Sequence, residues 1–277
     1  MRTLTAAISP CPNDTYIFGA LKMQNLPKVN FQYRFQLGDI KELNSWAATQ
    51  HYDLLKVSFF AYLQLKERYQ LLDAGAALGR GVGPLVVSNR PSMTVEELQQ
   101  ARIGIPGWNT TAHLLFHHFA PQAQNRKVLR FDEIMPAVAA KELDAGVIIH
   151  ESRFTYAEHG LHKLADLGDH WEQTTGKMIP LGGIVLKNSF SAEEKHQVEA
   201  DIRASLAFAR ERQEAIQSFI SRNAQEMTPE VMQKHIELYV NEFSEQLGPE
   251  GRAAIATLEQ VARDLQAQFP PQPEVEK

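Results

Sequence analysis

The segment Asp144-Ala145-Gly146-Val147-Ile148-Ile149-His150-Glu151 carries the clearest structural signal in this chain. It predicts a short buried strand, because an apolar run follows Gly146 and stops at an imidazole and a carboxylate. A helical pattern over residues 132–143 precedes it, and an apolar strand after a crossover helix is typical of the interior of a parallel sheet. Ligands of such sheets bind outside the carboxyl ends of the strands. The segment therefore predicts an α/β fold with a ligand beside His150.

His150 is the candidate catalytic residue at that edge. Histidine is the side chain best suited to exchanging a proton near neutral pH. The alternative is a histidine that merely covers the edge of the sheet with its hydrogen bonds satisfied. The pattern leaves both interpretations open.

Composition excludes several classes of protein. The chain has 277 residues, 44% of them hydrophobic and 22% charged, which allows one large domain or two lobes with separate cores. A net charge of −5 without a basic cluster argues against nucleic-acid binding. No apolar run reaches the ~20 residues that span a bilayer. The single cysteine, Cys11, favours a reducing compartment, and Pro10 and Pro12 interrupt the first apolar run, so we expect no signal peptide and a cytoplasmic location.

The first α/β unit predicts a loop on the ligand side. Residues 4–8 form a strand pattern, residues 9–15 hold two prolines and predict a turn, and a helix follows over residues 16–24. Asn13 or Asp14 could cap this helix. Cys11 in the same loop is either a nucleophile or a packing residue.

A second group of polar residues follows two further predicted elements. Asp39 and Glu42 have capping-box spacing at the start of a helix, and Asn44 on its first turns could face a ligand. Residues 52–57 predict the next strand, with Lys56 and then Ser58 at its carboxyl end. These two could bind a ligand. Alternatively, Lys56 is a surface stem and Ser58 a helix N-cap.

Two glycine-containing segments predict crossovers between lobes. Residues 79–84 contain three glycines, but Pro84 and a strand follow where a dinucleotide fingerprint requires a helix, so we discount a nucleotide. Residues 179–186 are apolar, contain two glycines and predict the second crossover.

A fresh α/β series lies between these crossovers. A strand over residues 102–105 is followed by a loop and by a helix over residues 112–119. Thr110 and Thr111 at the start of that helix could bind a carboxylate or phosphate, cap the helix, or do both. His113 and His117 lie four residues apart like a metal pair. No third ligand is present at the required spacing, so we predict an exposed helix face and no metal.

The C-terminal third is almost entirely helical in pattern. Ser191 with Glu194 forms a capping box, and Thr228-Pro229 predicts another helix start. Residues 270–277 are polar and rich in proline, which predicts disorder.

Seven short segments follow one another in an order and spacing that resemble a known family. They are Ser9-Pro10-Cys11-Pro12-Asn13-Asp14-Thr15, Asp39-Ile40 with Leu43-Asn44, Tyr52-Asp53 with Lys56-Val57-Ser58, Leu78-Gly79-Arg80-Gly81-Val82-Gly83-Pro84-Leu85, Gly104-Ile105-Pro106-Gly107 with Thr110-Thr111, Asp144-Ala145-Gly146 with His150-Glu151, and Leu181-Gly182-Gly183-Ile184. The family is the 1,4-dihydroxy-6-naphthoate synthases of the futalosine route to menaquinone. The resemblance covers about the first two-thirds of the chain, and the C-terminal helices agree only in pattern.

The resemblance implies a fold like a type II periplasmic binding protein, with two α/β lobes around a ligand cleft. Residues 1–88 with 183–277 would form the first lobe and residues 89–182 the second. It also implies a carbon–carbon lyase that converts cyclic dehypoxanthinylfutalosine to the dihydroxynaphthoate without a cofactor. The family's base falls on His150, and its substrate-contact segments fall on Lys56-Val57-Ser58 and Thr110-Thr111.

Two other functions share the expected fold. A solute-binding protein for transport would perform no chemistry, and the expected lack of a signal peptide argues against it. Chorismate dehydratase of the same pathway lacks, as we interpret it, the Ser9 to Asp14 opening and the arrangement of Asp144 and His150.

Overall fold

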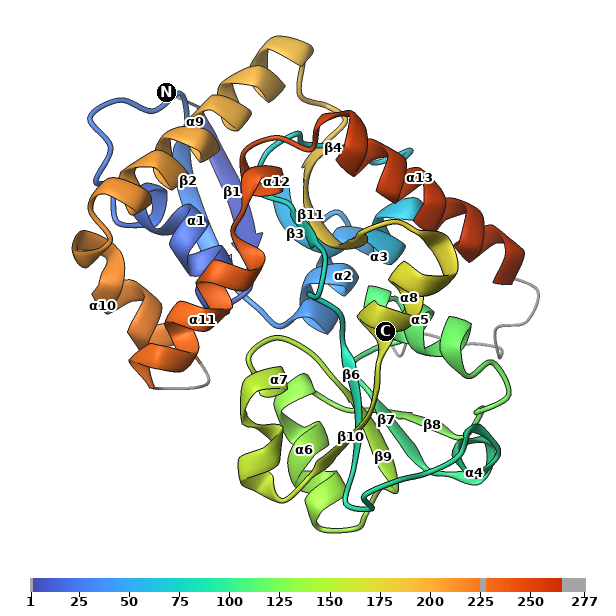
Figure 1. Ribbon diagram of the computed structural model, residues 1–277. Coiled ribbons are helices and arrows are strands. Elements are labelled where there is room, and N and C mark those ends of the chain that lie inside the picture. Colours follow the sequence, from blue (N-terminus) through green and yellow to red (C-terminus); the bar gives the residue numbers. More distant parts are fainter. Residues whose placement is uncertain (1, 225–227, 266–277) are drawn as a thin grey trace.

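Two lobes, each built around its own β-sheet, make up this protein (Figure 1). The structure is a computed structural model and describes residues 2–224 and 228–265. The disorder predicted for residues 270–277 lies outside the described residues. Within them, no helix combines the length and apolarity needed to cross a membrane.

The first sheet has the strand order β2-β1-β3-β11-β4, and β5 also pairs with β11. Strand β1 runs parallel to β2 and β3, whereas β11 runs antiparallel to β3, β4 and β5. The strands are β1 (Thr3–Ile8), β2 (Gln32–Leu37), β3 (Leu54–Ser58), β4 (Tyr69–Leu71), β5 (Ala77–Gly79) and β11 (Ile179–Lys187).

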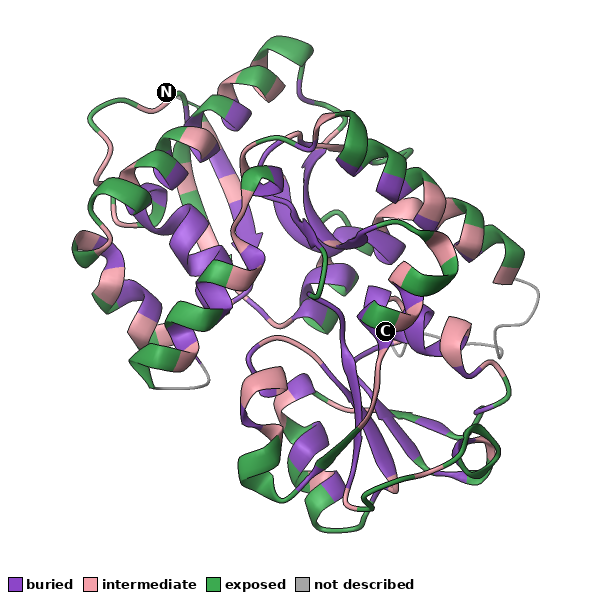
Figure 2. Ribbon diagram, viewed as in Figure 1, coloured by how far each residue is buried: buried purple, intermediate pink, exposed green. Residues whose placement is uncertain are grey.

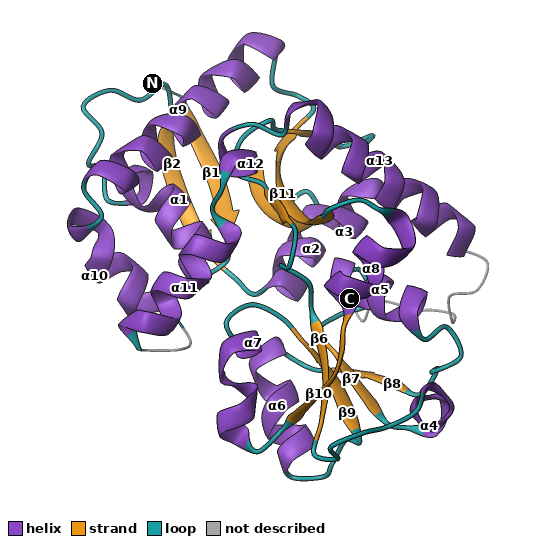
Figure 3. Ribbon diagram, viewed as in Figure 1, coloured by secondary structure: helices purple, strands orange, loops and turns teal. Residues whose placement is uncertain are grey.

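Alternation along the first strand builds a core on both faces of this sheet. Leu4, Ala6 and Ile8 pack against the helices of one face, and Ala7 packs with Leu43 of the other. Four helices cover the first face: α1 (Pro12–Lys22), α9 (Ala192–Glu211), α10 (Glu214–Asn223) and α11 (Pro229–Tyr239). The remaining helices of this lobe are α2 (Ile40–Ala48), α3 (Phe59–Leu63), α12 (Glu242–Glu245) and α13 (Gly248–Leu265). Figure 3 shows α1, α9, α10 and α11 beside strands β1 and β2.

Side-chain caps start several of these helices as the sequence predicts. Asp39 and Glu42 close a capping box on α2, and Ser191 and Glu194 close one on α9. Thr228 accepts from the backbone N–H of Val231 at the start of α11. Helix α1 differs from the prediction, because it begins at Pro12 with Cys11 as N-cap and without a side-chain cap. Asp14 lies inside its first turn.

The second sheet has the order β10-β6-β9-β7-β8. Its strands are β6 (Leu85–Ser88), β7 (Ile103–Ile105), β8 (Arg126–Val128), β9 (Ala145–Ile148) and β10 (His162–Asp166). The helical elements are α4 (Val95–Gln100), α5 (Thr111–Phe119), α6 (Phe131–Ala139), α7 (Ser152–Thr155), the 3-10 helix η1 (Tyr156–His159) and α8 (Leu167–Thr175). All of β9 is buried, as Figure 2 shows for the centre of this sheet.

Strand β9 lies in a mixed sheet, not in the parallel sheet that the sequence predicts. It is parallel to β7 and antiparallel to β6, because the chain enters this lobe along β6 in the opposite direction. Gly146 is needed in β9 for close packing: a Cβ there would lie 2.4 Å from Cγ2 of Ile134 on α6.

The chain crosses between the sheets twice, over residues 80–84 and residues 176–178. Both crossings come a few residues before the expected boundaries. Strand β6 already pairs within the second sheet and Ile179 already pairs within the first, so the expected division at 88/89 and 182/183 is displaced. Gly83 in the first crossing has no room for a Cβ, which would lie 2.3 Å from the backbone nitrogen of Gly168.

Candidate functional site

A cleft lies between the two lobes. Both lobes contribute to its lining, and the residues come from strand ends, helix starts and the two crossings. They are Ser9, Asn13, Asp14, Ile40, Lys56, Ser58, Ala77, Val82, Pro84, Thr110, Thr111, Ala112, Ile149, His150, Leu181, Gly182 and Tyr239. Five of the six residues predicted from sequence are among them.

His150 lines the cleft two residues beyond the end of β9. Its backbone is left-handed, with φ of 57°, an unusual conformation for a residue with a Cβ. Its ring lies 5.1 Å from the ring of Phe131 in an edge-on contact. Burial lowers the pKa of His150 to about 4, against the opposing effect of Asp14. The imidazole is therefore neutral at neutral pH, as a proton acceptor must be, and its role as a base stays a prediction.

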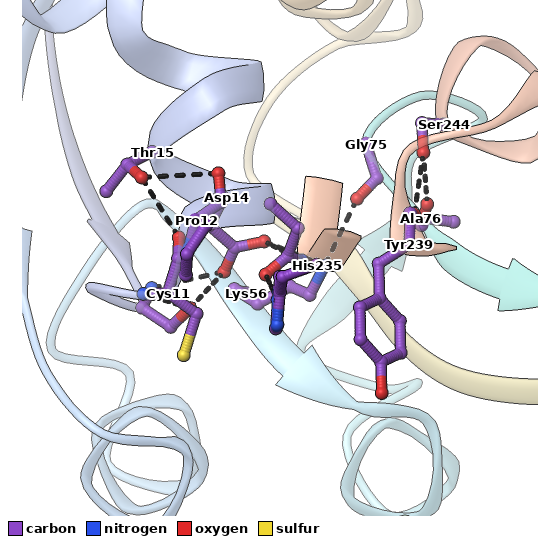
Figure 4. A network of polar contacts seen from close by, with 12 residues as sticks. Cys11, Pro12, Asp14, Thr15, Lys56, Gly75, Ala76, His235, Tyr239 and Ser244 are labelled. Carbon is purple, nitrogen blue, oxygen red and sulfur yellow. Dashed lines mark hydrogen bonds and ion pairs between the residues drawn. The ribbon is translucent and has the colours of Figure 1, made fainter. Parts of the chain in front are cut away.

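Lys56 forms a buried ion pair with Asp14 across the carboxyl ends of β3 and β1 (Figure 4). Its Nζ lies 3.1 Å from Oδ1 of Asp14 and donates to the carbonyl of Gly75 at 3.3 Å. Asp14 Oδ2 accepts from the backbone and the hydroxyl of Ser9, at 3.2 and 2.7 Å. Lys56 is only 5% exposed, so the alternative of a surface stem is wrong.

Ser58 and Asn44 bind each other at the start of α3. Asn44 Oδ1 accepts from the backbone N–H of Ser58 at 3.0 Å, and its Nδ2 lies 3.2 Å from the Ser58 hydroxyl. Ser58 is the N-cap residue of α3, but its side chain makes no capping hydrogen bond. Asn44 also donates to the carbonyl of Asn109 at 3.3 Å, which ties the first lobe to the second. Val57 is fully buried in the core with Leu43 and does not line the cleft.

Thr110 and Thr111 reach the cleft from the first residues of α5. Thr110 caps the helix: its hydroxyl accepts from the backbone N–H of His113 at 3.2 Å and donates to the carbonyl of Gly107 at 2.7 Å. Thr111 connects the lobes, because its hydroxyl donates to the carbonyl of Leu181 at 2.8 Å and accepts from the backbone N–H of Phe60 at 3.3 Å. Thr110 thus both caps the helix and lines the cleft. The N-terminus of α5 favours an anionic group at this place.

Sequence reasoning missed three residues of this site. The sequence indicates Asp14 only as a helix cap, and it gives no signal for Tyr239 or His235. Tyr239 lines the cleft, and burial raises its pKa to about 12, with a hydrogen bond to Arg153 opposing the shift. His235 is fully buried, and its Nε2 lies 2.9 Å from Oδ1 of Asn13. Both come from α11, more than 200 residues after Asn13, so no local spacing could have indicated them.

Cys11 lies beside His150 and Glu151, and ligand atoms of the three side chains lie within 4.8 Å of one another. Burial raises the pKa of the Cys11 thiol well above its usual value, and the charges of Glu151 and Asp14 add to the effect. The thiol is therefore protonated at neutral pH, which disfavours both a nucleophile and a metal thiolate at this position. The packing interpretation of Cys11 fits best.

His113 and His117 are not on an exposed face, so that prediction is wrong. Both are fully buried and bind the guanidinium of Arg126, with nitrogen-to-nitrogen distances of 2.8 and 2.9 Å. The His113 Nδ1–H donates to the carbonyl of Trp108 at 2.8 Å, so its Nε2 is the acceptor for Arg126. Burial, with Arg126 adding to the effect, lowers the pKa values of His113 and His117 to about 3 and about 4. The nitrogens that face Arg126 are thereby occupied, and the absence of a metal here stays a prediction.

Solved structures with this fold include proteins of several functions. A protein from Archaeoglobus fulgidus matches with a TM-score of 0.88 and 28% identity, over 96% of this chain and 98% of that one. The ligand-binding component of an ABC-type import system from Staphylococcus aureus matches at 0.70 with 12% identity, over 98% and 94%. A Candida albicans protein with the generic periplasmic-binding-protein fold matches at 0.65 with 12% identity, over 100% and 99%. The predicted periplasmic-binding-protein-like fold is thus confirmed.

Two curated relatives agree in name and in length. A 1,4-dihydroxy-6-naphthoate synthase from Thermus thermophilus is 41% identical over 98% of both chains. One from Streptomyces coelicolor is 41% identical over 92% of this chain and 91% of its own. The model of a family described as menaquinone biosynthesis matches residues 4–264. With the sequence, the fold and the cleft in agreement, the chain belongs to the menaquinone biosynthesis family.

Proposed function

We propose that this protein is a carbon–carbon lyase that converts cyclic dehypoxanthinylfutalosine to 1,4-dihydroxy-6-naphthoate on the futalosine route to menaquinone. Two relatives that carry the synthase name at 41% identity over nearly the whole chain support this proposal. So does the family, whose description is menaquinone biosynthesis. The single composition-level clue, one cysteine in 277 residues, agrees with work in the reducing cytoplasm.

One observation carries the proposed chemistry: a neutral imidazole, His150, at the wall of a cleft built from both lobes. His150 would accept a proton from the substrate while the carbon–carbon bond to the sugar-derived part breaks. The electron pair released by that proton loss allows the ring to become aromatic, which supplies driving force without a cofactor. A positioned base of this kind contributes ~100- to 10,000-fold in rate.

Substrate positioning would fall to the hydroxyls and the buried cation around this base. Thr110 and Thr111, at the N-terminus of α5, suit the carboxylate of the aryl group. Ser58 offers its hydroxyl from the opposite lobe. Lys56 is already paired with Asp14, so it would add charge to the cleft only as part of that pair.

A binding protein without chemistry is the second candidate, because the fold is shared with a ligand-binding component of an import system. Chorismate dehydratase is the third. Incubating the purified protein separately with cyclic dehypoxanthinylfutalosine and with chorismate, followed by chromatography and mass spectrometry, tests all three. We expect the dihydroxynaphthoate from the first substrate and no change in the second. Dehydration of chorismate, or binding without turnover of either compound, would overturn the proposal.

A further inference from the structure

Asn44 lies directly behind a wall of the cleft without being one of its lining residues. It belongs to α2 and is 6% exposed, whereas Ser58, at the end of β3, is 3% exposed and lines the cleft. Three groups surround the Asn44 amide: the backbone N–H of Ser58, the Ser58 hydroxyl and the carbonyl of Asn109. Two of the three are backbone groups, whose roles as donor and acceptor are fixed.

These backbone groups determine which way the Asn44 amide points. The Ser58 backbone N–H only donates, so the Asn44 atom 3.0 Å from it is the carbonyl oxygen Oδ1. The Asn109 carbonyl only accepts, so the Asn44 atom 3.3 Å from it is the nitrogen Nδ2. The group that faces the Ser58 hydroxyl at 3.2 Å is therefore an NH₂ group, which donates and does not accept.

The orientation of the amide fixes the role of the Ser58 hydroxyl. Its oxygen accepts a hydrogen bond from Asn44, so its own hydrogen is directed elsewhere. In the part of the chain that the structure describes, the Ser58 side chain has no acceptor for that hydrogen and does not cap α3. The hydrogen is therefore available to the cleft that Ser58 lines.

The other serine and threonine hydroxyls that line the cleft donate their hydrogens to the protein itself. Ser9 donates to Oδ2 of Asp14 at 2.7 Å. Thr110 and Thr111 donate to backbone carbonyls at 2.7 and 2.8 Å. Among the described residues of the lining, Ser58 is thus the serine or threonine whose hydroxyl hydrogen remains for a ligand.

We propose that Asn44 is a positioning residue that directs the hydroxyl hydrogen of Ser58 into the cleft, where Ser58 donates to a carboxylate oxygen of the substrate. The inference rests on the proposed function and deepens it. A carboxylate only accepts hydrogen bonds, so it matches a hydroxyl that is held as a donor. The Asn44 amide also binds Asn109, the residue before Thr110 at the N-terminus of α5. Asn44 therefore places the Ser58 donor beside the helix terminus that favours an anion.

A double-substitution cycle tests whether Asn44 acts through Ser58. Ser58→Ala removes the donor, and we expect KM to rise about 10- to 100-fold with kcat largely retained, as for a lost hydrogen bond to a charged group. Asn44→Leu keeps the size but not the amide. We expect KM to rise about three- to tenfold, because the hydroxyl hydrogen then spreads over three staggered positions. The protein with both substitutions should match Ser58→Ala within about twofold. Multiplication of the two single effects would overturn the proposal.

Asn241→Leu is the matched control for loss of a buried amide. Oδ1 of Asn241 accepts from the backbone N–H of Phe243 at 3.0 Å, and its Nδ2 donates to the carbonyl of Leu78 at 2.9 Å. These two backbone contacts resemble those of Asn44, but no printed contact joins Asn241 to a cleft hydroxyl. We expect a lower free energy of unfolding with KM unchanged. A rise in KM equal to that of Asn44→Leu would show that a lost amide acts through general loosening, and would overturn the proposal.

A second measurement needs neither the substrate nor a variant. In neutron diffraction of the perdeuterated full-length protein, we expect both deuterons of Asn44 Nδ2 to face Ser58 Oγ and the Asn109 carbonyl, and the Ser58 deuteron to point into the cleft. A Ser58 deuteron directed at Asn44 would overturn the proposal. Failure of the proposed function is a different result: the unmodified protein would form no product from cyclic dehypoxanthinylfutalosine, while the deuteron positions would stay as expected.

Discussion

Two pairs of buried histidines occupy this molecule, and they differ in what their nitrogens face. His113 and His117 lie inside the second lobe and place their acceptor nitrogens on one guanidinium. His150 and His235 lie where the lobes meet, and the ring of His150 accepts no hydrogen bond from the described residues and borders a cleft. All four rings have lowered pKa values because of burial. Burial and a lowered pKa are therefore common to both pairs and do not by themselves identify a functional residue. The pairs differ in their surroundings, since His113 and His117 bind Arg126 whereas His150 lines the cleft.

Removing His150 should produce the largest effect on turnover. We expect His150→Ala to lower kcat ~100- to 10,000-fold while substrate binding changes little, because a base acts mainly in the transition state. Steady-state kinetics and direct binding measurements check both parts. His117→Ala is the matched control in the other pair and should lower stability while leaving kcat intact. Near-normal turnover in His150→Ala or His150→Asn would end the assignment of the base.

Removing Arg126, the partner of His113 and His117, should lower the stability of the protein without changing its turnover. Arg126→Met keeps the bulk but leaves acceptor nitrogens on two buried histidines without their donor, at about 1–3 kcal/mol each. The expected result is a lower free energy of unfolding in urea with kcat unchanged. A variant of normal stability but reduced kcat would show that the internal pair is part of the catalytic site after all.

Acid should lower the folding stability of the protein through protonation of His113 and His117. Their pKa values are lowered to about 3 and about 4 in the folded protein, against ~6.5 when unfolded. Between these values the unfolded chain binds more protons, so their contribution to stability is complete above pH ~6.5 and is lost as pH falls toward 4. Melting temperatures measured from pH 7 to pH 4 should decline over this range. If a His113→Gln, His117→Gln variant declines equally steeply, other groups cause the loss.

The pH dependence of turnover should reflect the lowered pKa of His150. With the pKa of His150 near 4, its neutral form persists to about pH 4, well below the ~6.5 expected of an unshifted histidine. We expect kcat/KM to stay level down to about pH 5 in short pH-jump assays that finish before unfolding, and then to fall tenfold per pH unit below the pKa. If kcat/KM instead falls with a midpoint near pH ~6.5, burial in the substrate-free protein does not set the pKa of His150.

The smallest effect is expected at Thr111. Its hydroxyl is engaged between the carbonyl of Leu181 and the backbone N–H of Phe60, so Thr111→Val removes contacts between the lobes along with any contact to substrate. A neutral hydrogen bond contributes ~0.5–1.5 kcal/mol, which corresponds to a rise in KM of about 2- to 12-fold. Thr257→Val, on an exposed face of α13, should leave KM unchanged. A fall in kcat greater than the rise in KM would place Thr111 in the chemical step.

Local patterns predicted the elements better than they predicted the partners. The edge of the sheet beside His150, the capping boxes and the first crossing follow from spacing and from glycine and proline placement, which act within a few residues. The second crossing was predicted wrongly over residues 179–186, because that apolar segment is strand β11 of the first sheet and the chain crosses just before it, at residues 176–178. The burial of His113 and His117 depends on Arg126, whose position in a three-residue strand has no periodic signal. The contact of His235 with Asn13 joins residues 222 positions apart, so only the folded chain brings it about. The ion pair of Lys56 and Asp14 lies between these cases, since the sequence predicted the position of Lys56 at the carboxyl end of a strand but not its partner.

The two crossings constrain how the lobes can move. They lie side by side, since β5 ends at Gly79 where it pairs with Ile179 at the start of β11. Hinge closure of two lobes around a ligand uses a few loop residues that absorb the change in backbone angles, and these two short crossings are the segments that join the two sheets. Gly83 in the first crossing lies against Gly168 at the start of α8, with no room for a Cβ between them. Any residue larger than glycine at position 83 would therefore displace either the first crossing or the start of α8, right beside the cleft-lining residues Val82 and Pro84.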